Sequence, residues 1–139
     1  MPQLVAPGCY DLVDLVGWQP TPNSLSDRPI HVHNRLLTSA VLDADERRQV
    51  AATICDKLSS ATAPVALLLP TGGCNEWDRP GADLHDADGL AAFCEEITSR
   101  CPDTVDLHVL DCHINDQEFT TAALKVFDFW LENGTVKAG

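Results

Sequence analysis

Residues 43–69 read DADERRQVAATICDKLSSATAPVALLL, a stretch that predicts a helix leading into a buried strand. Apolar side chains recur every four residues across positions 50–58, which places them on one face of a helix. Asp43 with Glu46 three residues later has the pattern of a capping box at the start of that helix. The apolar run at 65–69 is typical of a short strand that is covered on both faces of a parallel sheet.

The alternation of helix and strand continues toward the C-terminus. Asp86 precedes an apolar helical face that ends at Pro102, which predicts a second helix. Residues 105–109 alternate apolar and polar side chains, the pattern of an edge strand with one wet face. A last helix is expected to begin with Asn115 as its cap and to continue to Leu131. Short extended segments are expected earlier in the chain, at 4–6, 12–16 and 30–33.

These elements predict one α/β domain over residues 1–139. Its sheet is expected to be open, mostly parallel and flanked by about three helices, as in half of a Rossmann-like lobe. In such sheets ligands bind beyond the carboxyl ends of the strands, where the helix N-termini point outward. The loops after the two expected parallel strands are therefore the first places to look for a site.

Charge and cysteine usage limit the class of protein. The 139 residues carry 9 Lys and Arg against 21 Asp and Glu, a formal net charge of −12. A nucleic-acid-binding protein neutralises phosphates with clustered Lys and Arg, so we expect no nucleic-acid binding here. The apolar runs are too short to cross a bilayer, and we expect no membrane segment. Six cysteines without a CxxC pair, in a chain that opens without a secretory signal, favour a reduced cytoplasmic protein.

The loop after the first parallel strand carries a glycine pair. Gly72 and Gly73 let a backbone approach a phosphate or a carboxylate closely, although an ordinary turn uses the same residues. Their spacing is that of neither a P-loop nor a dinucleotide fingerprint. We expect Gly72, Gly73 and the later Asp78 to take part in ligand binding.

The loop after the second parallel strand is rich in polar side chains. His113 is a candidate general base, with Asp111 or Asp116 to orient its ring. Asn115 is expected to bind ligand at the start of the last helix, where backbone N–H groups favour an anion.

A third polar segment contains His31, His33 and Asn34. An extended backbone points both imidazole rings to the same side, and we expect all three residues to line one pocket with the two loops. A His-x-His pair completed by His113 and Asp111 has the residue types of a metal site. Neutral hydrogen bonding in a pocket is the favoured interpretation, and no metal is assigned.

The order of several motifs resembles a known family. The chain contains GCYD at 8–11, RPIHVHN at 28–34, Pro70 followed by Gly73, Asp78 and Gly81, and DCHIND at 111–116 followed by Phe119. In this order they resemble the final part of the family of the tomato mosaic virus resistance protein, a set of mostly bacterial uncharacterised proteins described as ATP-binding. The resemblance covers almost the whole chain.

The resemblance implies that this chain corresponds to the last part of the second lobe of a longer, two-lobed protein. It implies a site for ATP with magnesium, and either a second polypeptide that carries the missing lobe or a homo-oligomer. In the family an Arg-Thr pair follows the His-Asn motif, whereas Val41 and Leu42 stand there in this chain. Because arginine is suited to bidentate phosphate binding, its loss implies weak binding of ATP by this chain alone.

Two functions from different classes fit these residues. The first is a small subunit or half-domain that supplies one wall of a pocket for a nucleotide or another small anionic ligand. The alternative is a component of an enzyme that acts on a small oxygenated metabolite, with His113 or His33 as general base. The sequence leaves both functions open.

Overall fold

The main sheet has β5 (Val65–Pro70) at its centre in the computed structural model, which describes residues 1–136. β5 pairs in parallel with β1 (Gln3–Val5) on one side and with β6 (Val105–Leu110) on the other. All six residues of β5 are buried, as expected for a strand that is covered on both faces.

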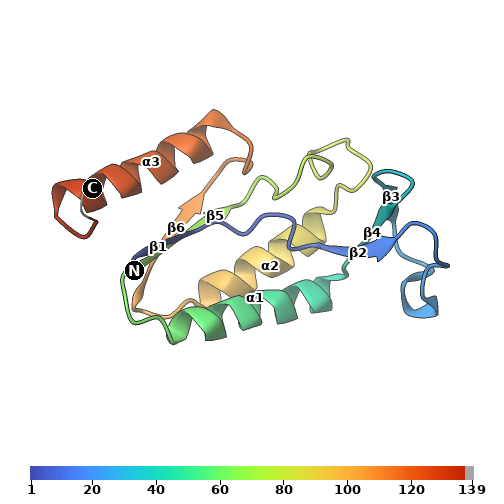
Figure 1. Ribbon diagram of the computed structural model, residues 1–139, viewed down its shortest axis with the longest axis horizontal. Coiled ribbons are helices and arrows are strands. Elements are labelled where there is room, and N and C mark those ends of the chain that lie inside the picture. Colours follow the sequence, from blue (N-terminus) through green and yellow to red (C-terminus); the bar gives the residue numbers. More distant parts are fainter. Residues whose placement is uncertain (137–139) are drawn as a thin grey trace.

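Helices cover both faces of this sheet (Figure 1). α1 (Ala44–Ser59) and α2 (Ala87–Arg100) pack on one face, where they meet Leu67 and Leu69 of β5. α3 (Gln117–Glu132) lies on the other face, where Val126 and Trp130 meet Leu68. Successive side chains of β5 point to opposite faces of the sheet and thus contribute to two separate apolar cores.

The ends of two helices follow the predicted chemistry. Asp43 and Glu46 exchange hydrogen bonds in a capping box at the start of α1, and the Asp86 carboxylate accepts from the Gly89 N–H at the start of α2. The prediction that Asn115 caps the last helix is wrong, because α3 begins at Gln117 with Asp116 in the cap position.

A second, antiparallel sheet stands beside the carboxyl end of the main one (Figure 1). Its strand order is β2-β4-β3, with β2 (Leu12–Val16), β4 (Leu37–Val41) and β3 (Ile30–Val32), and a short 3-10 helix η1 (Asn23–Leu25) lies between β2 and β3. β2 and β3 occupy segments that were expected to be extended. The central strand β4 was not predicted.

Over residues 1–136 the predicted α/β class with a parallel sheet and about three helices is confirmed, and the antiparallel sheet is an addition to it. Within residues 1–136, none of the helices is both long enough and apolar enough to cross a membrane.

Replacing Leu68 by alanine tests the role of β5. The Leu68 side chain is fully buried, so Leu68→Ala should lower the free energy of unfolding by about 2–5 kcal/mol. The matched change Val109→Ala, at a position 52 % exposed on the edge strand β6, should cost about 0.5 kcal/mol or less. Urea unfolding followed by circular dichroism measures both, and equal losses would contradict the assignment of β5 as the doubly covered strand.

Candidate functional site

The chain segments after β5 and β6 continue side by side beyond the ends of the strands. The Gly72 N–H donates to the Cys112 carbonyl at 3.0 Å, and the Ile114 N–H donates to the Gly73 carbonyl at 3.1 Å. A Cβ on Gly72 would stand 2.7 Å from the Cys112 carbonyl carbon, so this close approach requires glycine. Gly73 has a φ of +128°, which also favours glycine. The glycine pair therefore holds the two loops together.

The Asp78 carboxylate organises both loops. Its Oδ2 accepts hydrogen bonds from the backbone N–H groups of Cys74 at 2.6 Å and Asn75 at 3.3 Å. Its Oδ1 lies 2.9 Å from Nε2 of His113, which comes from the segment after β6. One buried carboxylate thus fixes the shape of its own loop and attaches the second loop to it.

The His113 ring is 2 % exposed, and both of its nitrogens have partners. Nδ1 accepts from the Asn115 N–H at 3.0 Å, so the ring proton belongs on Nε2. Nε2 then donates to Asp78 and to the Asn75 carbonyl, which is 2.8 Å away. In this arrangement the ring connects the two loops. The predicted catalytic role of His113 stays a prediction.

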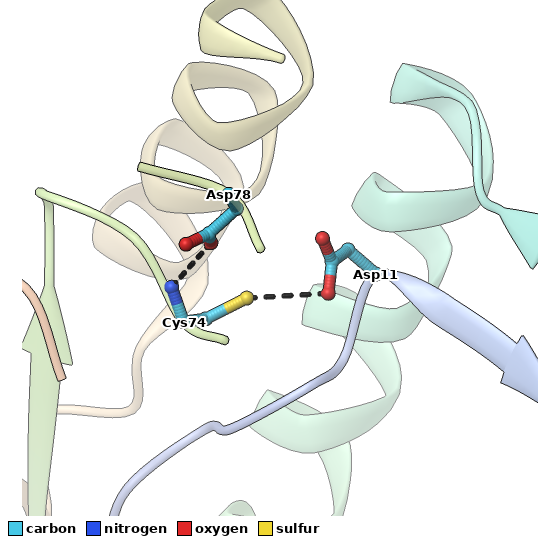
Figure 2. Close-up of side chains that lie close together, drawn as sticks. All are labelled: Asp11, Cys74 and Asp78. Atoms are coloured by element: carbon cyan, nitrogen blue, oxygen red, sulfur yellow. Dashed lines mark hydrogen bonds between the residues drawn. The ribbon is translucent and has the colours of Figure 1, made fainter. Parts of the chain in front are cut away.

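A third segment enters the site through Asp11, which precedes β2 and is 1 % exposed. The Asp11 carboxylate accepts two contacts from the Asn75 amide nitrogen, at 3.1 and 3.0 Å, and one from the Cys74 thiol at 3.3 Å. Figure 2 shows Asp11 facing Cys74 from one side while Asp78 bonds the Cys74 backbone from the other. Burial, reinforced by the Asp11 charge, holds the pKa of the Cys74 thiol far above its usual range, so the thiol keeps its proton.

Asp11, Cys74 and Asp78 also have the spacing of a cation site, because their ligand atoms lie within 4.8 Å of one another. Each of these atoms already takes part in a hydrogen bond with the protein. This group differs from the combination of His31, His33, His113 and Asp111 that was considered from the sequence without a metal being assigned.

Aromatic rings gather at the rim of this buried network. The ring centroids of His31 and Trp77 are 4.2 Å apart, and His33 meets Trp77 edge-on at 5.7 Å. Trp77 is the neighbour of Asp78, so the histidines of the antiparallel sheet lie against the loop after β5. The three polar segments thus lie near one another at one end of the sheet, and the expectation that His31, His33 and Asn34 line a ligand pocket stays a prediction.

Three other predicted residues lie outside the buried network. The Asn34 side-chain oxygen accepts from the N–H groups of Leu36 and Leu37 at 2.7 and 3.0 Å, which closes the turn between β3 and β4. The Asn115 amide donates to Glu76 at 3.0 Å. Asp111 is exposed. Their predicted roles in ligand binding and catalysis remain predictions.

Asp116 connects α3 to the site. Its carboxylate accepts a hydrogen bond from the backbone N–H of His113 at 2.8 Å and forms an ion pair with Arg79 at 2.9 Å. The backbone hydrogen bond, followed by the contact with Arg79, holds the pKa of Asp116 below its usual range. Because this carboxylate is turned back toward the loop, it makes no side-chain cap of the helix that it precedes.

The site therefore contains residues that were not among the predicted ligand-binding and catalytic residues. Asp11, Cys74 and Asn75 form the buried centre, and Trp77 forms the rim. Asp11 was visible only as the last residue of the GCYD motif, and Asn75 as a polar residue of the loop. The hydrogen bonds of Asp11 to Cys74 and Asn75 join segments more than 60 residues apart in the chain.

The fold and site define an α/β domain in which two strand ends and an inserted antiparallel sheet enclose a buried polar network. The model of an uncharacterised protein family, the UPF0261 C-terminal domain, matches residues 1–131, and the chain belongs to this family. A UPF0261 protein of Brucella melitensis is 45 % identical over 139 residues, which are 100 % of this chain and 33 % of the relative. The tomato ToMV resistance protein Tm-1 (Solanum lycopersicum) is 29 % identical over 133 residues, 91 % of this chain and 17 % of that protein.

A UPF0261 protein of Clostridium tetani is 27 % identical over 126 residues, 90 % of this chain and 31 % of the relative. The chain thus spans about a third of the length of the UPF0261 proteins that it matches.

Removing the Asp78 carboxylate tests its part in shaping the loops. Asp78→Ala leaves two buried N–H groups without their acceptor and removes one of the two acceptors of the His113 ring, and should lower the free energy of unfolding by about 3 kcal/mol. Asp83→Ala removes an exposed carboxylate from the same loop and should change stability by less than about 0.5 kcal/mol. Denaturant unfolding of both variants is the measurement. A small loss for Asp78→Ala would mean that the loop holds its shape without this acceptor.

Thiol labelling tests the electrostatics of the site. Cys9 is exposed, but partial burial and then the charges of Asp11, Asp78 and Asp14 raise its pKa. Less thiolate is then present at neutral pH, so alkylation of Cys9 should be slow at pH 7 and should accelerate about tenfold per pH unit up to the raised pKa. Cys74 should react only after unfolding. Peptide mass spectrometry after timed alkylation separates the two, and full reactivity of Cys9 at pH 7 would contradict the acidic surroundings.

Proposed function

We propose that this chain is a half-lobe of a two-lobed binding protein and forms one wall of a pocket for a nucleotide or another small anionic ligand. The other wall comes from a second polypeptide or from a second copy of the chain. The observation that carries the proposal is the buried network of Asp11, Asn75, Asp78 and His113, which joins three segments at the carboxyl end of the parallel sheet.

The energetics of this network support a binding role. Asp11 is 1 % and Asp78 is 7 % exposed, and within residues 1–136 the structure gives neither carboxylate a Lys or Arg partner. Burying carboxylates among neutral donors costs free energy that an apolar core would not cost. In exchange, the network holds the long loops rigidly at the carboxyl ends of the strands, where open α/β sheets bind ligands. Such prearranged loops are a common feature of binding sites.

The charges of this wall indicate which part of a ligand it contacts. Its exposed groups include the acidic Glu76 and Asp111, and Arg79 is engaged by Asp116. The Gly72 N–H is bonded to Cys112, so it is not part of the proposed anion contact. We therefore assign the planar or hydroxyl-bearing part of the ligand to this wall, beside the Trp77 ring, and its anionic group to the other wall.

Calorimetric titration of magnesium-ATP tests the proposal. The isolated chain has few free cations and only one wall, so we expect a Kd on the order of micromolar to millimolar. Co-expression with the part of the Brucella melitensis relative that this chain does not match should tighten binding. Trp77→Ala should then weaken it about tenfold, since loss of one stacked ring costs about 1–3 kcal/mol.

Trp18→Ala is the matched control, because Trp18 is 65 % exposed and lies outside the site loops. Tight, stoichiometric binding by the isolated chain would contradict the need for a second wall. Equal losses of affinity in the Trp77 and Trp18 variants would show that the surface around Trp77 does not contact the ligand.

A further inference from the structure

The edge of β1 is open within residues 1–136. The Gln3 N–H donates to the Pro64 carbonyl, so Gln3 directs its backbone groups toward β5. Successive residues of a strand alternate, and the N–H and C=O of Leu4 therefore point away from β5. The main sheet thus ends in a strand that is able to pair with another one.

Helix α3 carries a second apolar stripe beside the one that faces the sheet. Leu124, Phe127 and Leu131 follow one another at helical spacing, and they are 55 %, 42 % and 36 % exposed. The stripe that faces the sheet, which includes Val126 and Trp130, is buried in the core. A helix that is apolar on two adjacent faces is typical of one that packs against a further element.

The open edge and the exposed stripe are continuous. Leu4 pairs in register with Ala66, so its side chain is on the sheet face that α3 covers. Leu4, Phe127, Trp130 and Val136 line a hollow of about 420 Å³ between the edge of β1 and α3. The lining is almost entirely apolar, and the hollow has room for several side chains.

We propose that a βα unit of the polypeptide that supplies the rest of the lobe docks on this surface. Its strand lies parallel to β1, and its helix lies beside α3 with an apolar stripe on Phe127. The inference rests on the half-lobe part of the proposed function and does not depend on which ligand is bound.

Chain handedness favours this placement of the helix. The step from β5 to β6 goes through α2, which packs on the face opposite to α3. Crossovers between parallel strands are right-handed. A connection that steps across the sheet in the direction from β6 toward β1 therefore places its helix on the face that α3 covers. A strand beside β1 whose crossover leads away from β5 therefore puts its helix next to the exposed stripe of α3.

The length of the relatives favours a separate segment as the occupant. This chain covers 33 % of the Brucella melitensis protein, so about two thirds of that protein is available to supply strands and helices beyond β1. A second copy of this chain would pair two β1 edges about a twofold axis, which makes them antiparallel and brings two α3 helices together. The test distinguishes the two occupants.

The experiment co-expresses the tagged full chain with the unmatched two thirds of the Brucella melitensis relative, and measures co-purification and mass by light scattering. Wild type should give a one-to-one complex. Phe127→Asp should reduce recovery at least tenfold, since it places a charge in the docking surface, and Leu124→Asp is a second variant for the same stripe.

Phe129→Asp is the control. Phe129 is 61 % exposed on the same helix, but helical spacing places it on the opposite flank of the buried stripe. Recovery should stay at the wild-type level in this variant, and circular dichroism of each isolated variant verifies its fold.

Loss of the complex in the two stripe variants alone would support the proposal. Absence of any complex with wild type, or equal effects of Phe127→Asp and Phe129→Asp, would overturn it. A homodimer of the isolated chain that Phe127→Asp dissociates would also overturn it, in favour of a second copy. A complex that forms but does not bind magnesium-ATP would refute ATP as the ligand and would leave the docking surface standing.

Discussion

The Asp78 carboxylate, which accepts from Cys74, Asn75 and His113, is the constraint on which the loops at the carboxyl end of the parallel sheet depend. The loop after β5 has little regular structure. Without this acceptor its buried backbone N–H groups would have to be exposed to water to form hydrogen bonds. With the carboxylate in place, Asn75 is positioned to bond Asp11 and Trp77 is positioned against His31. The same carboxylate holds His113, and through it the segment that leads into α3.

The parts of the fold that could be predicted are those in which local pattern and burial agree. α1 and β5 follow directly from periodicity, capping and an uninterrupted apolar run. β4 escaped prediction because its sequence, LTSAV, has small and polar residues whose burial comes from β2 and β3 on either side. Its strand character is a property of the three-stranded sheet, which no local window contains.

The start of α3 was misplaced for a related reason. Asn115 and Asp116 are both good capping residues, and local sequence favours the first as much as the second. The outcome is decided by contacts from elsewhere, because the Asn115 amide bonds Glu76 and the Asp116 carboxylate bonds the His113 N–H and Arg79. The candidate site shows the same limit. The convergence of three polar segments could be predicted from the strand ends, whereas the choice of Asp11 as partner of Asn75 is a long-range event.

The antiparallel sheet is inserted between β1 and α1, which in a simple crossover would be joined by a short connection. The two ends of this excursion meet, since the Leu42 N–H donates to the Asp11 carbonyl at 2.8 Å. A segment whose ends are one hydrogen bond apart can be exchanged for another of different length without disturbing the strands on either side. The molecule thus consists of a parallel-sheet frame and an inserted segment that is attached to it at closely spaced ends. Variation in that segment alters the rim carrying His31 and His33 while the frame keeps its geometry.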